Sequence, residues 1–347
     1  MTADPARSRR VRAFVFLAVM LLAVGGSVAY VARAYGDRVR ASSGPDRADT
    51  AADLAAVTAR PHVVFRSTAP GPAEGHVAAV PVDAAGGPRA VTPAVCDRVY
   101  ATRAHAVCLA AEATLNARTY RVRVLDPGWT SGHDLFRTPG LSSRTRLSPS
   151  GALVATTAFV YGDSYNSPGK FSTRTTITPV GDTRAGTDLE NYTLTIDGRV
   201  TRNPDRNFWG VTFADDETFY ATAATGRHTY LVRGSVRART LTALRRDVEC
   251  PSLSPDGTRI AFKKHGTLAD GEWRLAVYDL RTTRETLTAE TRSVDDQAEW
   301  LDDTHLLYGL RTGPVKSGTT DIWTVDASGG GTPRIFIPQG WSPSVIR

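Results

Sequence analysis

Acidic and basic side chains stand just before several short apolar runs of this 347-residue sequence. Paired carboxylates can share a proton for acid–base chemistry or bind a hard cation such as Ca²⁺, and arginines beside them can hold an anionic group. Asp is also frequent near turns for hydrogen-bonding reasons alone, so mixed charge without a ligand is the alternative. The candidate residues are Arg144, Arg146, Trp209, Glu249, Asp295, Asp296, Gln297 and Glu299, with Asn207 and Phe208 beside Trp209.

Catalytic motifs do not accompany these residues. The sequence lacks a Gly-x-Ser-x-Gly nucleophile elbow, a His-Glu-x-x-His pair and a Walker-type glycine loop. The seven histidines are dispersed and no Cys-x-x-Cys occurs, so we predict neither a metal site nor a cofactor. Whether the chain is an enzyme stays open, and a non-catalytic role is favoured.

The three cysteines raise the question of a disulfide. Cys96 and Cys108 flank a short reversal, where they can face each other on adjacent antiparallel strands and oxidise outside the cytoplasm. The alternative is that both are small core residues and that Cys250 is a third.

The first forty residues predict export. Four arginines lie between Arg7 and Arg12, and Ala13–Ala32 then carries no charge over twenty residues, enough to cross the ~30 Å hydrocarbon core. The preceding positive charge keeps the amino terminus in the cytoplasm. We therefore expect a cytoplasmic tail (1–12), a transmembrane anchor or signal segment (13–34) and a linker (35–60), which makes a single-pass cell-membrane protein. Because Ala32-Arg33-Ala34 is a small-x-small site, secretion after cleavage near Ala34 is the alternative.

From His62 onward, short alternating or apolar runs are broken by Gly, Pro, Asp and Asn, which is typical of strands. Residues 250–262 read as a strand, a Ser-Pro-Asp-Gly turn and a second strand, and Trp273–Leu280 as a third. The same order recurs at 147–155, 211–220 and 298–308. Such recurrence predicts blades of four antiparallel strands in an all-β propeller.

Two degenerate units between His62 and Arg137 bring the predicted number of blades to six. The earliest unit lacks an opening strand, whereas Trp341–Ile346 begins a motif and stops. Closing the ring removes exposed sheet edges. We therefore expect residues 61–347 to form one propeller in which the strand 341–346 completes the first blade.

These residues resemble the TolB-like propeller repeat, with Ser254–Phe262 and Trp273–Leu280 as the best match. The sequence is also similar to actinobacterial membrane-anchored TolB-like proteins. It departs from the repeat at Asp302-Asp303 and at Ser150, which replace turn residues. The resemblance implies a six-bladed fold and the binding of a protein or ligand, with no implied chemistry.

In a propeller the innermost strands line a central channel, so the candidate residues are expected at its mouth. We predict a monomeric, non-catalytic, extracytoplasmic propeller that binds or scaffolds a protein or envelope partner, with the loop Tyr161–Lys170 as a candidate contact surface. The alternative is a sugar- or peptide-binding module, or a hydrolase or lyase, with an acidic site at the channel mouth. The net charge of +7 is scattered, without a basic stripe, which excludes a nucleic-acid partner.

Overall fold

A computed structural model describes residues 5–41, 52–113, 118–160, 172–184, 186–312 and 318–347. The chain divides into two compact units. The first consists of residues 1–47 with 69–72, and the second, which contains the sheets, of the remaining residues. The loop predicted at Tyr161–Lys170 lies outside the described residues.

The N-terminal unit contains the helix α1 (Pro5–Ala41). Its stretch Val15–Arg33 is long and apolar enough to cross a membrane. Large apolar side chains such as Phe16 and Leu22 are exposed there, as a lipid-facing helix requires. The helix extends beyond both ends of the predicted segment 13–34.

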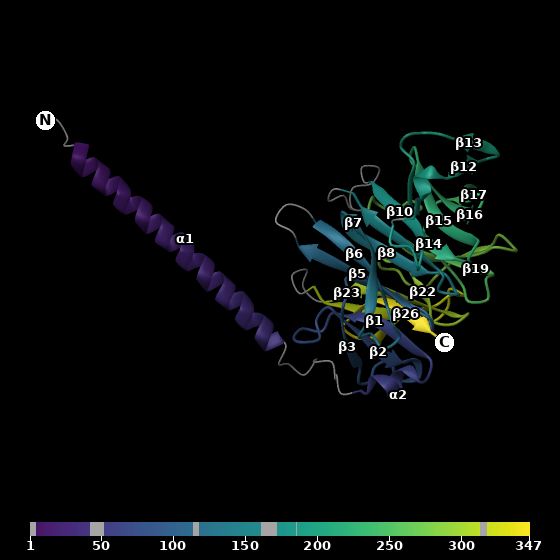
Figure 1. Ribbon diagram of the computed structural model, residues 1–347, viewed down its shortest axis with the longest axis horizontal. Helices are drawn as coiled ribbons and strands as arrows, with labels where there is room; N and C mark the ends of the chain where they lie inside the picture. The colour runs from purple at the N-terminus through teal and green to yellow at the C-terminus, as the bar shows by residue number, and fades with distance from the viewer. Residues whose placement is uncertain (1–4, 42–51, 114–117, 161–171, 185, 313–317) are drawn as a thin grey trace. The chain divides into compact units, whose positions relative to one another are not determined.

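Six sheets confirm the predicted propeller of four-stranded antiparallel blades, which are numbered here along the chain (Figure 1). From the innermost strand outward, the first three blades are as follows. Blade 1 contains β26 (Gly340–Ile346), β1 (His62–Ser67), β2 (His76–Pro81) and β3 (Ala90–Val95); blade 2 contains β4 (Arg98–Ala101), β5 (Ala106–Ala113), β6 (Arg118–Leu125) and β7 (Gly132–Pro139); blade 3 contains β8 (Leu141–Leu147), β9 (Leu153–Phe159), β10 (Thr173–Pro179) and β11 (Thr187–Asp188).

The second half of the ring has the same order of strands. Blade 4 contains β14 (Asn207–Phe213), β15 (Thr218–Thr225), β16 (His228–Ser235) and β17 (Thr240–Arg246), and its outer edge is extended by β12 (Thr193–Ile196) and β13 (Arg199–Thr201); blade 5 contains β18 (Glu249–Leu253), β19 (Arg259–Lys264), β20 (Arg274–Asp279) and β21 (Glu285–Leu287); blade 6 contains β22 (Glu299–Trp300), β23 (His305–Arg311), β24 (Thr320–Asp326) and β25 (Arg334–Ile337). The strand β12 runs parallel to β17, an addition that the repeat pattern did not predict.

Strand β26 joins the two ends of the ring. It pairs antiparallel with β1, with His62 opposite Ile346 and Val64 opposite Ser344 (Figure 1). Its buried Ser344 hydroxyl also accepts from the backbone N–H of Ala101 at 3.0 Å and donates to the carbonyl of the same residue at 2.9 Å. One serine therefore links the closing strand of blade 1 to the innermost strand of blade 2.

Apolar side chains are buried between neighbouring blades, in six clusters that each join one adjacent pair. Because successive side chains of a strand point to opposite faces, Val63 and Phe65 of β1 pack towards blade 6, whereas Val64 packs towards blade 2. Fully burying one such side chain stabilises the fold by about 1.5–3 kcal/mol. Burial on both faces explains why these strands read as continuous apolar runs.

A disulfide joins Cys96 to Cys108, whose Cα atoms are 5.5 Å apart. Both cysteines are buried in the cluster between blades 1 and 2. The bond ties the connection between those blades to β5. Cys250 is a buried free thiol.

The cysteine pairing predicts a definite labelling pattern. In denaturant without reductant, iodoacetamide should label one thiol per chain, and after reduction all three. Removing the disulfide by Cys96→Ala and Cys108→Ala together should lower the free energy of unfolding by about 2–4 kcal/mol in urea titrations, because the open chain gains entropy. Three labelled thiols without reductant would contradict the bond.

Candidate functional site

The innermost strands line the channel, and three of them carry the same bulge. In β14, β18 and β26, two residues oppose a single residue of the next strand. The first bulged residue is left-handed in each: Gly210 (φ 67°), Cys250 (φ 49°) and Ser342 (φ 56°). A Cβ at Gly210 would lie 2.7 Å from the Cα of Cys250, so only glycine fits there. Each bulge changes the direction of the side chains that precede it.

Two buried ion pairs cross the channel from blade 3 to blade 6, which lie opposite each other in the ring. Arg144 Nη2 lies 2.9 Å from Asp296 Oδ1, and Arg146 Nη1 lies 2.7 Å from Glu299 Oε2. All four side chains are less than 10% exposed. Buried charges are tolerated only when they are paired and hydrogen-bonded, and further contacts complete these pairs.

Backbone groups and an aromatic ring hold the paired side chains in place. The N–H of Gly309 donates to Asp296 Oδ2 at 2.9 Å, and Arg146 Nη2 donates to the carbonyl of Ala298 at 3.0 Å. The Arg146 guanidinium also lies 4.5 Å from the ring centroid of Tyr100, a favourable cation–π contact. One charge of each pair, Asp296 and Arg146, is therefore also held by a neighbouring group.

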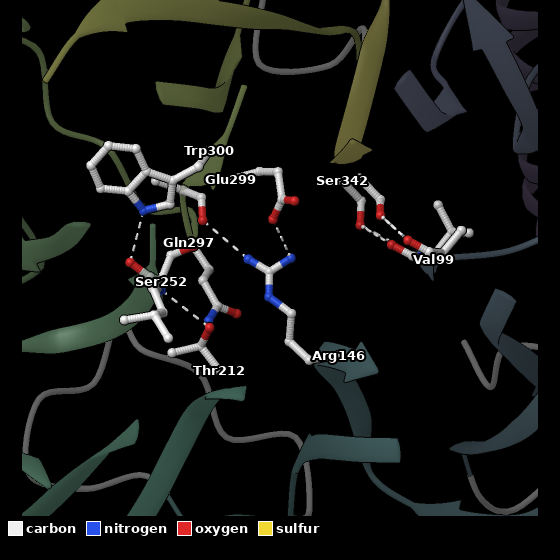
Figure 2. A network of polar contacts seen from close by, with 12 residues as sticks. Val99, Arg146, Thr212, Ser252, Gln297, Glu299, Trp300 and Ser342 are labelled. Carbon is white, nitrogen blue, oxygen red and sulfur yellow. Dashed lines mark hydrogen bonds and ion pairs between the residues drawn. The ribbon is translucent and has the colours of Figure 1, made fainter. Parts of the chain in front are cut away.

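Polar contacts between the innermost strands continue around the channel (Figure 2). Gln297 Nε2 donates to the carbonyl of Pro251 at 2.7 Å, and Trp300 Nε1 donates to that of Ser252 at 2.9 Å, so blade 6 is bonded to blade 5. On the other side, the Ser342 hydroxyl donates to the Val99 carbonyl at 3.2 Å. The cavity between Arg144, Arg146 and Ser342 has about 20 Å³, which suits a single water rather than an organic ligand.

A second charged group lies at the mouth, around a lysine that is fully buried. Lys263 Nζ donates to Asp295 Oδ1 at 2.6 Å and lies 3.8 Å from the ring centroid of Trp273. Trp273 Nε1 in turn donates to Glu249 Oε1 at 3.0 Å. Asp295 remains 44% exposed, so it is the accessible carboxylate of this group.

The two mouth carboxyls differ in acidity. Burial raises the pKa of Glu249, although Lys263 and the Trp273 N–H oppose the shift. Burial also acts on Asp295, but the cations Lys263, Arg144 and Arg98 together lower the pKa of that carboxyl, with Lys263 making the largest contribution among them. Two carboxyls with diverging pKa values are the arrangement that acid–base chemistry uses. Structural ion pairs produce the same divergence.

Trp209 is the predicted site residue that is buried in an apolar cluster, with 1% of its surface exposed. It packs there with Phe159, Cys250 and Trp273, because the bulge at Gly210 changes the direction of the side chains before it. Its neighbour Asn207 accepts from the backbone N–H of Thr173 at 3.0 Å. These residues connect blades 3, 4 and 5.

Lys263 and Trp273 hold the predicted carboxylates but were not among the residues expected at the site. The available signal was a lysine directly after the apolar run Ile260–Phe262, in a chain with only four lysines. Within the described part of the chain, no three His, Cys, Asp or Glu side chains are grouped as metal ligands. Ligand binding at the eight candidate residues stays a prediction.

Removing one partner of a buried ion pair should destabilise the fold. Arg146→Met leaves Glu299 buried without its cation and should lower the free energy of unfolding by about 3–5 kcal/mol in urea titrations. Adding Glu299→Leu should restore most of this loss. As a matched control, Arg137→Met removes an exposed partner of Glu112 and should cost at most ~1 kcal/mol.

The stability of Arg146→Met should depend more strongly on pH than that of the wild type. Burial raises the pKa of Glu299 in the folded protein, and Arg146 opposes this shift. Without Arg146, the pKa of Glu299 in the folded protein rises further above its value in the unfolded chain. Between these two pKa values the folded state therefore binds more protons than the unfolded state. Stability is therefore retained at acidic pH and lost as the pH increases, and the deficit of Arg146→Met should be smaller at pH 5 than at pH 8. A deficit independent of pH would show that Glu299 does not titrate.

Searches against family models and against curated proteins found no match. Solved structures do share the fold. TolB from Acinetobacter baumannii is 13% identical with a TM-score of 0.57, and the match covers 83% of this chain and 67% of that one. A TolB homologue from Agrobacterium tumefaciens is 14% identical with a TM-score of 0.50 over 81% and 90% of the chains. A chain of a nidogen/laminin complex is 12% identical with a TM-score of 0.50 over 82% and 98%. The similarity to the two TolB structures supports a six-bladed, TolB-like propeller fold.

Proposed function

We propose that this chain is a non-catalytic binding propeller that is held outside the cytoplasmic membrane and binds or scaffolds a protein or cell-envelope partner. The observation that supports this most is the pairing of the channel charges. Arg144, Arg146, Asp296 and Glu299 neutralise one another across the axis and leave room for about one water. Their role is structural, so the outer faces of the blades become the surfaces for binding.

The proposed location rests on two features in different parts of the chain. The stretch Val15–Arg33 meets the length and composition of a membrane span, and arginines precede it. The disulfide between Cys96 and Cys108 is of the kind that persists outside the cytoplasm. We propose α1 as an uncleaved signal anchor with a cytoplasmic amino terminus; secretion after cleavage near Ala34 is the alternative.

A partner should be recovered from intact membranes. The full chain with a C-terminal tag would be cross-linked in cells, solubilised in neutral detergent and analysed by mass spectrometry. We expect the same protein or envelope polymer in every replicate. The matched control is the tagged anchor and linker alone, residues 1–60. Equal recovery by this control, or the absence of a reproducible partner, would contradict the proposal, and release of the tagged chain into the medium would contradict the anchor.

A second function is favoured only by the charged group at the channel mouth, which consists of Glu249, Lys263, Trp273 and Asp295. The accessible Asp295 with a lowered pKa and the buried Glu249 with a raised pKa match a base and an acid beside a Lys263 cation. A sugar- or peptide-binding module, or a hydrolase or lyase, could use such a set. The diverging pKa values are also explained by the ion pair and the burial, which is why we rank this function second.

A substitution at Asp295 separates the two functions. If the chain is a binding propeller, Asp295→Asn should leave the recovery of the partner unchanged. Oligosaccharides, peptides and Ca²⁺ should then produce no shift in the melting temperature that depends on Asp295. The matched control is Asp197→Asn, since the Asp197 side chain is 82% exposed on blade 4. A ligand that stabilises the wild type and the control but not Asp295→Asn would establish the acidic site.

A further inference from the structure

A larger cavity lies at the opposite end of the innermost strands from the mouth, where β26 ends and β1 begins. Its volume is about 360 Å³, within the range of small-molecule sites. Its walls are residues 58–62, which follow α2 (Leu54–Thr58), the β4–β5 turn at 102–106, the β6–β7 turn at 127–129, and residues 346–347. We refer to it as the basic groove. It shares no residue with the channel mouth.

The basic groove is lined by more cationic than anionic groups. Its polar side chains include Arg60, Arg103, Arg347, His62 and His105, and none of its lining residues is acidic. Among the described residues, no Asp or Glu side chain forms an ion pair with Arg103, although its Nε donates to a terminal carboxylate oxygen of Arg347. Two planar Nη groups of that guanidinium remain as donors, and such groups match phosphate or carboxylate oxygens.

Arg60 forms only a weak ion pair within the chain. It pairs with Asp83 at 3.1 Å, but both side chains are more than half exposed. Exposed pairs of this kind contribute about 0–1 kcal/mol, so an anion in the groove can compete for the guanidinium. The contrast with the mouth is clear, because there the buried Lys263 is held by Asp295.

An aromatic side chain supplies the apolar wall. Trp129 is 5% exposed and has φ 61°, a left-handed backbone that is rare for a bulky residue. Its loop is held by Asp126 Oδ1, which accepts from the backbone N–H groups of Thr130 and Ser131 at 3.1 and 3.0 Å. Pro61 and Ile346 add further apolar surface to the cavity. The groove thus offers a rigid apolar wall beside its cations.

His62 places a further polar group in the wall. It is 5% exposed, and its Nδ1 lies 2.7 Å from the carbonyl of Arg60. A carbonyl can only accept, so Nδ1 carries the proton and the neutral ring has Nε2 as an acceptor. A ligand with a hydroxyl beside its anionic group would satisfy both His62 and the arginines.

From this geometry we propose that the basic groove binds a small organic anion, a phosphate or carboxylate on an apolar or planar body. The anionic group contacts Arg103 and Arg60, and the body lies against Trp129. This proposal does not rest on the proposed partner binding, since it is argued from the residues of the groove alone. The phosphate can come from a free metabolite or from a lipid headgroup, which the test below separates.

The test uses the full chain in neutral detergent and phenyl phosphate as the probe, followed by calorimetry. We expect saturable binding that is tighter than that of inorganic phosphate, which lacks the apolar body, and than that of benzyl alcohol, which lacks the charge. Arg103→Gln should weaken phenyl phosphate about tenfold or more, because hydrogen bonds to charged groups are lost. The matched control Arg227→Gln removes an exposed arginine in the β15–β16 turn and should not change the affinity.

Dihexanoyl phosphatidylglycerol and dihexanoyl phosphatidylcholine, added to the same sample, separate the two sources of the anion. Binding of the glycerol lipid that depends on Arg103 and exceeds that of phenyl phosphate supports the site and assigns a lipid headgroup. Tighter binding of phenyl phosphate supports the site and assigns a free metabolite. No saturable binding of any anion, or equal losses in Arg103→Gln and Arg227→Gln, overturns the proposal, whatever the outcome of the partner cross-linking.

Discussion

Two buried ion pairs across the propeller axis constrain the rest of the structure. Arg144 with Asp296 and Arg146 with Glu299 join blade 3 to blade 6, the blades that are farthest apart in the ring. A charge in this position is stable only beside its partner, so the pairs require the innermost strands to converge at a definite distance. They also decide what the channel can do. Each of these four charges is already neutralised by its partner, so a ligand at the channel mouth would have to compete with the ion pairs.

The sequence predicts the fold well because each repeat carries its own local signals. Ser254–Gly257 specifies a turn, and strands such as Val63–Phe65 are apolar on both faces because each face packs against a neighbouring blade. Repetition of such units along the chain determines the architecture, since a single blade cannot bury its own faces. The additional strands β12 and β13 were not predicted, because they extend one blade only and have no counterpart in the repeat.

The candidate site was predicted less completely, for two physical reasons. Partners such as Arg146 and Glu299 are brought together by the closure of six blades, which no local pattern encodes. The direction of Trp209 depends on the bulge at Gly210, where one additional residue changes the alternation of the strand. The candidate residues were selected by their position in loops, but whether each side chain faces water, a neighbouring side chain or the core depends on this geometry.

The two ends of the channel differ in electrostatics, and this difference has a consequence for closure. At the mouth, Asp295 neutralises Lys263, whereas the basic groove has three arginines and no Asp or Glu side chain in its lining. The groove is also built from both ends of the ring, since His62 opens β1 and Ile346 ends β26, and the two residues are paired. The groove therefore exists only when β26 has closed the first blade. An anion that binds there binds the closed ring alone, and by mass action it must stabilise the closed ring against every state in which β26 is detached.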